Sequence, residues 1–277
     1  MHVHQIYFRF EDEGRTTSRV AARDEDVLRA TMMDRMPCDR TDVVYTLWTL
    51  EAATRLIREE YPIFEKVLEL RRSRFPIVLC DFFRYLLMYH FGGIYLDLDF
   101  VPVRPLGAIF EDAEAGRVCH TPANGTPSVL LCEEWENSFH MTETLHNGAL
   151  HSRAPGHPFW WDLVWRVYRE VVVRGRAIES AEDVYVVSGP KLLRECAREA
   201  HATYRDVVYL PYYAACPYVA VTPHGRVVCN GTEAVPSIRE SSWVFFNVED
   251  APQLPARCPR SYYVNVCLSQ GSMWKRP

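Results

Sequence analysis

One stretch of the sequence, residues 77–99, constrains the fold more than any other. Its first part, IVLCDFFRYLLMYHF (77–91), is apolar at nearly every position, which is typical of a helix that is buried on all sides. Gly92 and Gly93 follow, where the end of a helix favours a residue with positive φ. The next residues, IYL, predict a short strand that delivers Asp97 and Asp99. The stretch therefore predicts a buried helix, a glycine-based stop and a strand in direct succession.

The rest of the chain alternates between strand and helix patterns up to about residue 210. The predicted strands are 3–8, 43–48, 117–121, 128–132, 183–190 (a strand and turn) and 206–213, and the predicted helices are 51–61, 64–72, 158–174 and 191–201. This order predicts an α/β fold with a largely parallel sheet. The strand-rich end, at 226–230, 242–248 and 261–268, is expected to add antiparallel strands to the same sheet. No linker is visible, so we expect residues 1–277 to form a single domain.

Composition and charge narrow the class of function. The net charge of −5 does not favour a nucleic-acid-binding protein, which normally carries a basic surface. We expect no membrane span, because no run of about 18 uncharged apolar residues exists. The nine cysteines form no CxxC pair, which favours reduced thiols. The N-terminal residues soon turn acidic, unlike a signal peptide. We therefore expect a cytoplasmic protein.

Two pairs of charged residues are candidates for chemistry. Asp97 and Asp99 are two positions apart on an extended segment, so their carboxylates can share one side and need solvent, a proton or a cation. Hard oxygen ligands suit Mg²⁺ or Mn²⁺, and Mg²⁺ held in this way commonly bridges to substrate phosphates. Asp81 and Arg84 lie one turn apart on the apolar helix. Taken alone, the first pair reads as a solvated strand end and the second as an ion pair that closes the core.

A longer sequence match favours a functional role for both charged pairs. Residues 81–106, DFFRYLLMYHFGGIYLDLDFVPVRPL, resemble the DXD-containing signature of glycosyltransferase family 32 and, more distantly, the catalytic domains of the large clostridial glucosylating toxins. The resemblance implies a GT-A type fold, with a Rossmann-like mixed and mainly parallel sheet flanked by helices and a strand-rich C-terminal part. It also implies a metal-dependent glycosyltransferase that retains anomeric configuration. The matching positions are Asp81, Arg84, Gly92, Gly93, Tyr95, Asp97 and Asp99.

The resemblance implies a role for each residue of the signature. Asp99 would bind the metal, Mn²⁺ or Mg²⁺, and Asp97 would bind the metal or the ribose. Asp81 and Arg84 would orient the sugar hydroxyls, and Arg84 would also offset charge on the diphosphate. Tyr95 would line the donor pocket.

Outlying segments extend the match to about residue 220, with a further S-W segment at 241–246. Tyr7 stands in the family's base-stacking position, Asn147 matches a sugar-contacting asparagine, and Ser188-Gly189 resemble a T-G-P turn. Trp243 belongs to the S-W segment. Without the resemblance, Tyr7 and Trp243 read as core residues, Asn147 as a turn residue and Ser188 as a helix N-cap.

One position departs from the family pattern. Many relatives carry a histidine just before the S-W segment as a further metal ligand, whereas this chain has Glu240. A glutamate can serve as the third protein ligand, so Glu240 is the expected one.

The expected reaction moves a hexose from a nucleotide-diphospho-sugar to a hydroxyl acceptor. A UDP-sugar is favoured because the toxin-like features match users of UDP-sugars, and a GDP-sugar is possible. The partners expected are this nucleotide sugar and a glycan acceptor rather than a protein one. Two alternatives stay open. IYLDLDFV and VYVVS also fit motifs of haloacid-dehalogenase-like phosphatases, and a relative that binds a nucleotide sugar or glycan without turnover would carry the same residues.

Overall fold

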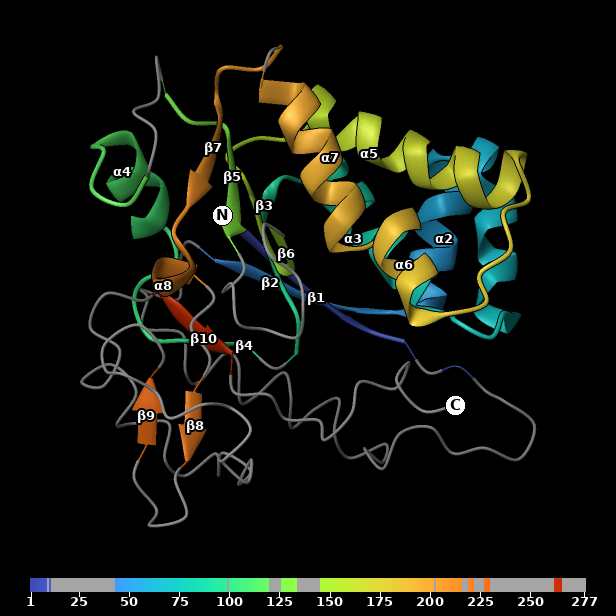
Figure 1. The fold of residues 1–277 in the computed structure, drawn as a ribbon, viewed down its shortest axis with the longest axis horizontal. Helices are drawn as coiled ribbons and strands as arrows, with labels where there is room; N and C mark the ends of the chain where they lie inside the picture. The colour runs from blue at the N-terminus through green and yellow to red at the C-terminus, as the bar shows by residue number, and fades with distance from the viewer. Residues whose placement is uncertain are drawn as a thin grey trace.

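A mixed, mainly parallel sheet of six strands forms the centre of the structure, a computed structural model (Figure 1). It describes residues 1–8, 10, 43–98, 100–119, 126–133, 145–201, 203–215, 219–221, 227–229 and 262–265. The strands are β1 (His2–Tyr7), β2 (Val44–Thr49), β3 (Gly93–Leu96), β5 (Val129–Glu133), β6 (Leu145–Ser152) and β7 (Val207–Leu210), in the order β2-β1-β3-β6-β5-β7. Only β6 runs antiparallel to its neighbours. The predicted α/β class is confirmed.

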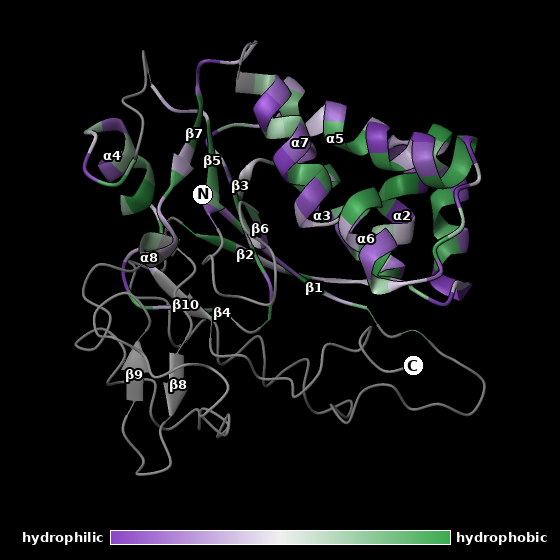
Figure 2. Cartoon of the chain, viewed as in Figure 1, coloured by the Kyte–Doolittle hydropathy of each residue, from purple (hydrophilic) through white to green (hydrophobic). Residues whose placement is uncertain are grey.

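Helices cover both faces of this sheet, and each face has its own apolar core. Figure 1 shows α4 (Ala108–Glu114) on one side and the larger helical layer on the other. That layer comprises α2 (Leu50–Glu60), η2 (Pro62–Arg72, a 3₁₀ helix), α3 (Ile77–His90), α5 (Pro158–Tyr168), η3 (Arg169–Val173, a π turn), α6 (Ala181–Val187) and α7 (Pro190–His201). Figure 2 shows hydrophobic and hydrophilic bands on α7, whose Leu193 and Ala197 are fully buried in the core. The apolar face of the amphipathic helix α7 therefore packs toward this side of the sheet.

The predicted succession of helix, glycines and strand at 77–96 is confirmed. Eleven of the fourteen residues of α3 are buried, as expected for a helix apolar all round. Gly92 has φ +64°, and its N–H donates to Met88 O, a left-handed helix stop. Gly93 has φ +84°, and a Cβ there would lie 2.2 Å from the backbone oxygen of His2. The glycine pair therefore lets β3 turn directly from α3 and approach the backbone of β1 closely.

Three sequence predictions differ from the structure. Residues 183–187, predicted as a strand, belong to α6, which begins at a capping box between Ser180 and Asp183. The predicted strand at 117–121 is a bend at 117–118 and has no regular structure at 119, the last of its described residues. The strand-rich end does not extend the main sheet in the part the structure describes. There β10 (Tyr263–Asn265) pairs with β4 (Phe100–Pro102), and β8 (Val219–Val221) with β9 (Val227–Cys229).

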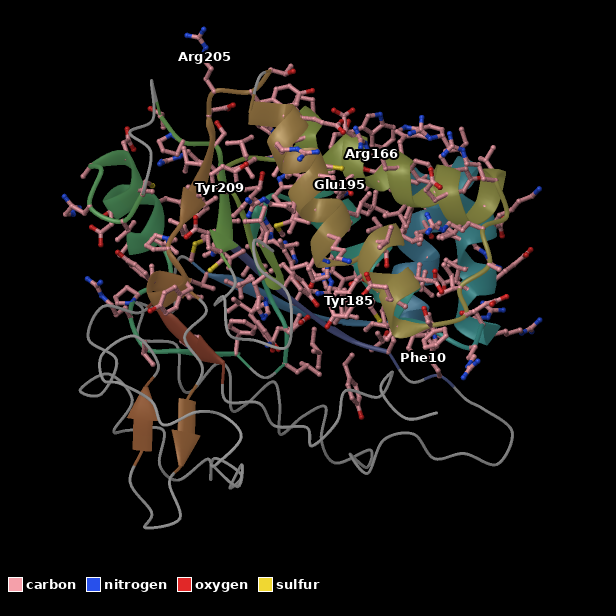
Figure 3. All side chains as sticks on the ribbon, viewed as in Figure 1. Phe10, Arg166, Tyr185, Glu195, Arg205 and Tyr209 are labelled. Carbon is pink, nitrogen blue, oxygen red and sulfur yellow. The ribbon has the colours of Figure 1, made fainter. Side chains whose placement is uncertain are left out.

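Charged side chains form ion pairs on the outer surface of the helical layer. Arg166 of α5, labelled in Figure 3, pairs with Glu199 of α7 and ties the two helices together at the surface. The short helix α8 (Tyr212–Ala215) follows β7. Over the described residues, no helix combines the length and the apolar character that a membrane crossing requires.

Candidate functional site

The charged residues of α3 are buried and hold together segments from distant parts of the chain. Asp81 and Arg84 are 3% and 4% exposed, and Arg84 Nη2 lies 3.2 Å from Asp81 Oδ1. Asn147 Nδ2 donates to the same oxygen at 3.0 Å, and Ser188 Oγ donates to Asp81 Oδ2 at 2.7 Å. The Asp81 carboxylate therefore joins α3 to β6 and to the turn between α6 and α7.

Asp97 stands at the carboxyl end of β3 and meets this cluster through Arg84. Arg84 Nη1 lies 3.3 Å from Asp97 Oδ1 and donates to the backbone oxygen of Asn147 at 2.8 Å. The hydroxyl of Tyr95 donates to Asp97 Oδ1, and the ring of Tyr95 lies under the guanidinium, 5.0 Å from Cζ of Arg84. The Asp97 side chain stays 33% exposed, so its carboxylate is positioned and still accessible from solvent.

Burial and charge both shift the ionisation of this cluster. Burial raises the pKa of the Asp81 carboxyl, against the opposing effects of Arg84 and of the hydrogen bonds from Ser188 and Asn147. Burial opposes the charge of Arg84, yet Asp97, Tyr95 and Asp81 hold its pKa well above the ordinary value. Burial likewise raises the pKa of Tyr95, so its hydroxyl keeps its proton and remains a donor to Asp97.

The residues present fit a divalent cation next to Asp97. One guanidinium is shared by two carboxylates, so the ionised cluster keeps one net negative charge. Arg84 Nε is buried and has no hydrogen-bond partner among the described residues. The described residues contain no group of three or more His, Cys, Asp or Glu placed to hold a metal. An arrangement of few carboxylates completed by substrate phosphates and water is the one Mg²⁺ commonly takes.

The other predicted site residues divide into two groups. Tyr7 lies at the carboxyl end of β1, next to β3, and is 8% exposed. Carboxyl ends of neighbouring parallel strands share one edge of a sheet, where open α/β sheets bind ligands, so Tyr7 and Asp97 occupy the same edge. Gly189 is buried directly after Ser188, in the turn that precedes α7. Asp99, Glu240 and Trp243 lie outside the described residues.

Sequence reasoning missed three residues beside Asp97. Gln5 of β1 is fully buried and donates through Nε2 to the backbone oxygen of Asp97 at 3.1 Å, and Tyr45 donates to Gln5 Oε1 at 2.7 Å. A glutamine in the middle of an otherwise buried strand was the available signal. His146 and Gly148 of β6 lie on the other side of Asp97, and only the pairing of β6 with β3 reveals them.

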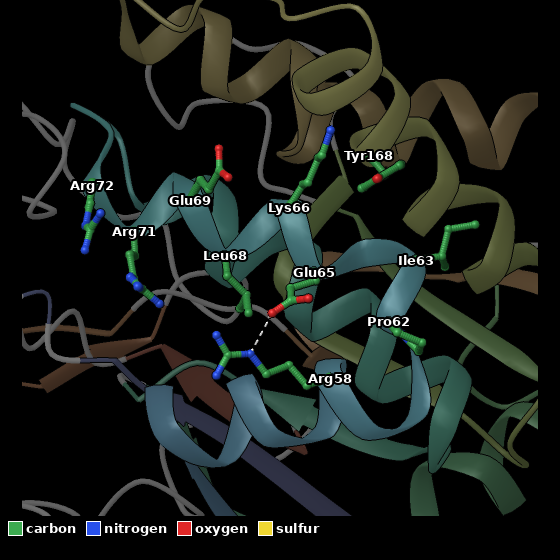
Figure 4. Close-up of a pocket in the computed structure, with 10 residues that line it drawn as sticks. All are labelled: Arg58, Pro62, Ile63, Glu65, Lys66, Leu68, Glu69, Arg71, Arg72 and Tyr168. Atoms are coloured by element: carbon green, nitrogen blue, oxygen red, sulfur yellow. Dashed lines mark hydrogen bonds and ion pairs between the residues drawn. The ribbon is translucent and has the colours of Figure 1, made fainter.

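A surface hollow of about 550 Å³ lies apart from this cluster. Residues of α2 and η2, together with Tyr168, line it, and Arg58 forms an ion pair with Glu65 across it (Figure 4). None of the signature residues borders this hollow. Its lining carries both signs of charge, with Arg58, Lys66, Arg71 and Arg72 basic and Glu65 and Glu69 acidic.

Comparison with known proteins finds a match for the segment that carries Asp81, Arg84 and Asp97. Residues 27–115 match the family model described as glycosyltransferase sugar-binding region containing DXD motif. Two proteins of Saccharomyces cerevisiae, the mannosyl phosphorylinositol ceramide synthases SUR1 and CSH1, are 45% and 46% identical to this chain over 58 residues. These residues are 21% of this chain and 15% of each relative.

One solved structure, described as PaToxG glycosyltransferase, aligns with 72% of this chain and 67% of its own length. Its TM-score is 0.43 and its sequence identity 10%. The resemblance predicted from residues 81–106 is confirmed by the family model, which spans the same signature. Over residues 27–115, this chain is therefore similar to the DXD-containing sugar-binding region of glycosyltransferases.

Proposed function

We propose that this protein is a metal-dependent glycosyltransferase that moves a hexose from a nucleotide-diphospho-sugar to a hydroxyl group of an acceptor. The position of Asp97 carries the proposal. Asp97 follows directly after β3, inside the matched region. Its carboxylate is held by Tyr95 and Arg84, and its side chain stays one third exposed. A carboxylate that is both fixed and accessible suits a cation that links the protein to a diphosphate.

The residues of the cluster have distinct tasks in this proposal. Asp97, Asp99 and Glu240 would hold the divalent ion, Mn²⁺ or Mg²⁺, which when bound supplies charge stabilisation for the departing diphosphate. Arg84 orients Asp97 and offsets phosphate charge, because its guanidinium already bridges the two carboxylates.

The remaining residues shape the space for the donor. Asp81 orients Asn147 and Arg84 toward the sugar hydroxyls, since both side chains contact its Oδ1. Tyr7 would stack on the base at the same edge of the sheet. Ser188 fixes Asp81 from the opposite side. Retention of anomeric configuration rests on the family resemblance, and the anomer of the product, read by NMR, tests it.

Two observations bear on the identity of the sugar donor. The toxin-like signature favours a UDP-sugar, whereas the relatives in yeast are named for a mannosyl product, which adds a mannosyl donor to the candidates. A glycan acceptor and a cytoplasmic location are the further parts of the proposal. The phosphatase alternative is weakened, because the segment VYVVS, read as its second motif, lies mainly in helix α6.

Calorimetric titration tests the proposal directly. UDP, GDP, UDP-glucose, UDP-galactose, UDP-N-acetylglucosamine and GDP-mannose are each titrated with Mn²⁺ and again with EDTA, and donor hydrolysis is followed in the same samples. We expect one nucleotide to bind only with metal and one of its sugars to be hydrolysed slowly. Binding without hydrolysis or transfer would support the non-catalytic alternative, and no metal-dependent binding would refute the proposal.

Substitution of the motif residues is the first prediction. Asp97→Asn and Asp99→Ala should abolish metal-dependent nucleotide binding, because each removes a ligand charge. Asp162→Asn, on the exposed surface of α5, is the matched control and should bind as the unaltered protein does. An Asp97→Asn protein with full affinity in Mn²⁺ would contradict the role given to that carboxylate.

A further inference from the structure

Strand β6 is irregular next to the candidate site. On its β5 side, Leu131 pairs with Leu150, but the next residue, Cys132, pairs with His146. The intervening residues 147–149 therefore have no partner residue in β5 and form a bulge in the regular ladder between β5 and β6. Bulges of this kind are over-represented beside active sites, where they redirect side chains. This one brings both Asn147 and His146 to the end of β3.

Gly148 lets two side chains converge at this bulge. A Cβ on Gly148 would lie 2.6 Å from Asp97 Oδ2 and 2.6 Å from Cε1 of His146. Because both atoms lie this close to one point, they are separated by no more than twice that distance. The imidazole of His146 therefore stands beside the Asp97 oxygen that Tyr95 does not occupy, since Tyr95 donates to Oδ1.

Contacts with Gly148 and Phe100 orient the His146 ring. The backbone N–H of Gly148 donates to His146 Nδ1 at 2.9 Å, and the ring packs edge-to-face on Phe100, with centroids 5.3 Å apart. Because Nδ1 accepts a hydrogen bond, the neutral ring carries its proton on Nε2. His146 is thus an N–H donor of defined orientation, immediately beside the carboxylate proposed to hold the cation.

We propose that His146 is a phosphate-binding residue of the donor site, whose Nε2–H donates to an oxygen of the nucleotide diphosphate. This inference rests on the function proposed above and deepens it. A protonated Nε2 suits an anionic oxygen rather than a metal ion, which needs a free lone pair. Hydrogen bonds to a charged acceptor are the strong ones, so His146 contributes to diphosphate affinity in a way that Asp97 does not.

The test compares ligands that differ in the diphosphate. His146→Leu and His146→Gln are titrated in Mn²⁺ with UDP and GDP, and with uridine and guanosine. We expect His146→Leu to weaken binding of the diphosphate about tenfold or more without changing binding of the nucleoside. His146→Gln, which can place an amide N–H near the former Nε2, should recover part of the loss. His151→Asn, on the same strand but bonded to Leu130 O, is the control and should show no loss.

The outcomes separate this inference from the proposed function. If the unaltered protein binds neither diphosphate with metal, the proposed function fails. If it binds one and His146→Leu binds it equally well, only the role of His146 is refuted. Equal losses for diphosphate and nucleoside would also refute it. Titration of Mn²⁺ without nucleotide, followed by electron paramagnetic resonance, provides the last check, because a loss of metal affinity in His146→Leu would make His146 a metal ligand instead. If His146→Leu does not fold, as thermal unfolding will show, His146→Gln and His146→Asn carry the same comparison.

Discussion

Arg84 shows how closely stability and function are linked in single residues of this site. Its guanidinium lies between the carboxylates of Asp81 and Asp97 and is almost fully buried. Removing one partner of a buried ion pair leaves an uncompensated charge and typically costs about 3–5 kcal/mol. Substitutions of Arg84 or Asp81 therefore test folding as much as catalysis. Asp97 is the better probe, because its side chain is 33% exposed and Arg84 keeps Asp81 as a partner when Asp97 is changed.

Tyr7 offers a second test at this scale. If its ring stacks on the base, Tyr7→Ala should weaken binding of the free nucleoside diphosphate by about 1–3 kcal/mol, the range for base–aromatic stacking. Calorimetry measures this change, and Tyr7→Phe, which keeps the ring, should bind nearly as the unaltered protein does. Because Tyr7 is 8% exposed, thermal unfolding of both variants is the control. Unchanged affinity in Tyr7→Ala would show that Tyr7 does not stack on the base and is only a core residue.

Among the helices and strands, the prediction from sequence was most accurate where one strong local signal determined the structure. The apolar helix α3, its glycine stop and strand β3 follow from composition and the demand for positive φ at Gly92. Helix α6 was mistaken for a strand because of Val184, Tyr185 and Val186, and the local capping box decided the outcome. Strand β6 was not predicted, since Asn147-Gly148 resembles a turn, and its course depends on pairing with β3.

The site itself was predictable to a similar extent. The resemblance brought together Asp81, Arg84, Asp97, Asn147 and Ser188, and the structure places their side chains in one cluster. Gln5 and His146 were missed for one reason: their contacts with the Asp97 segment depend on strand register and on the bulge in β6. Neither quantity can be read from the order of residues alone.

The turn between α6 and α7 makes a testable contribution to stability. Ser188→Ala removes the hydroxyl that donates to the buried Asp81 carboxylate, and leaving such an acceptor unsatisfied costs about 1–3 kcal/mol. We expect this decrease in the free energy of unfolding, measured by urea denaturation. Ser188→Thr, which keeps the hydroxyl and matches the residue of the family's turn, should lose much less. Equal stability of the alanine and serine proteins would show that Asp81 does not depend on this bond.

For the whole molecule, burial of histidines predicts how stability depends on pH. His4 and His151 are fully buried, and burial lowers the pKa of each from 6.5 to about 4. The unfolded chain therefore binds these protons more tightly than the folded one. Their contribution to stability is present above about pH 6.5 and is lost as the pH falls toward 4.

Urea denaturation between pH 7.5 and pH 5 measures this effect. Each pKa unit corresponds to about 1.4 kcal/mol. As the pH falls from 7.5 to 5, the shifted pKa of each histidine should therefore lower the free energy of unfolding by about 2 kcal/mol. His151→Asn can still donate to Leu130 O but does not titrate, so it should reduce the slope. A flat profile for the unaltered protein would contradict the prediction.

The position of β1 in the sheet has a practical consequence for anyone who wishes to excise or transplant the recognisable part of this sequence. Residues 27–115 include β2 and β3, but β1, which lies between them and pairs with both, comes from residues 2–7. A fragment with those borders would lack β1 and also β6, the other neighbour of β3, so β2 and β3 would both expose unpaired edges, which invite aggregation. The boundary of sequence likeness is therefore not the boundary of a folding unit, and a transplant needs at least the chain from β1 through β7, which includes all six strands of the sheet.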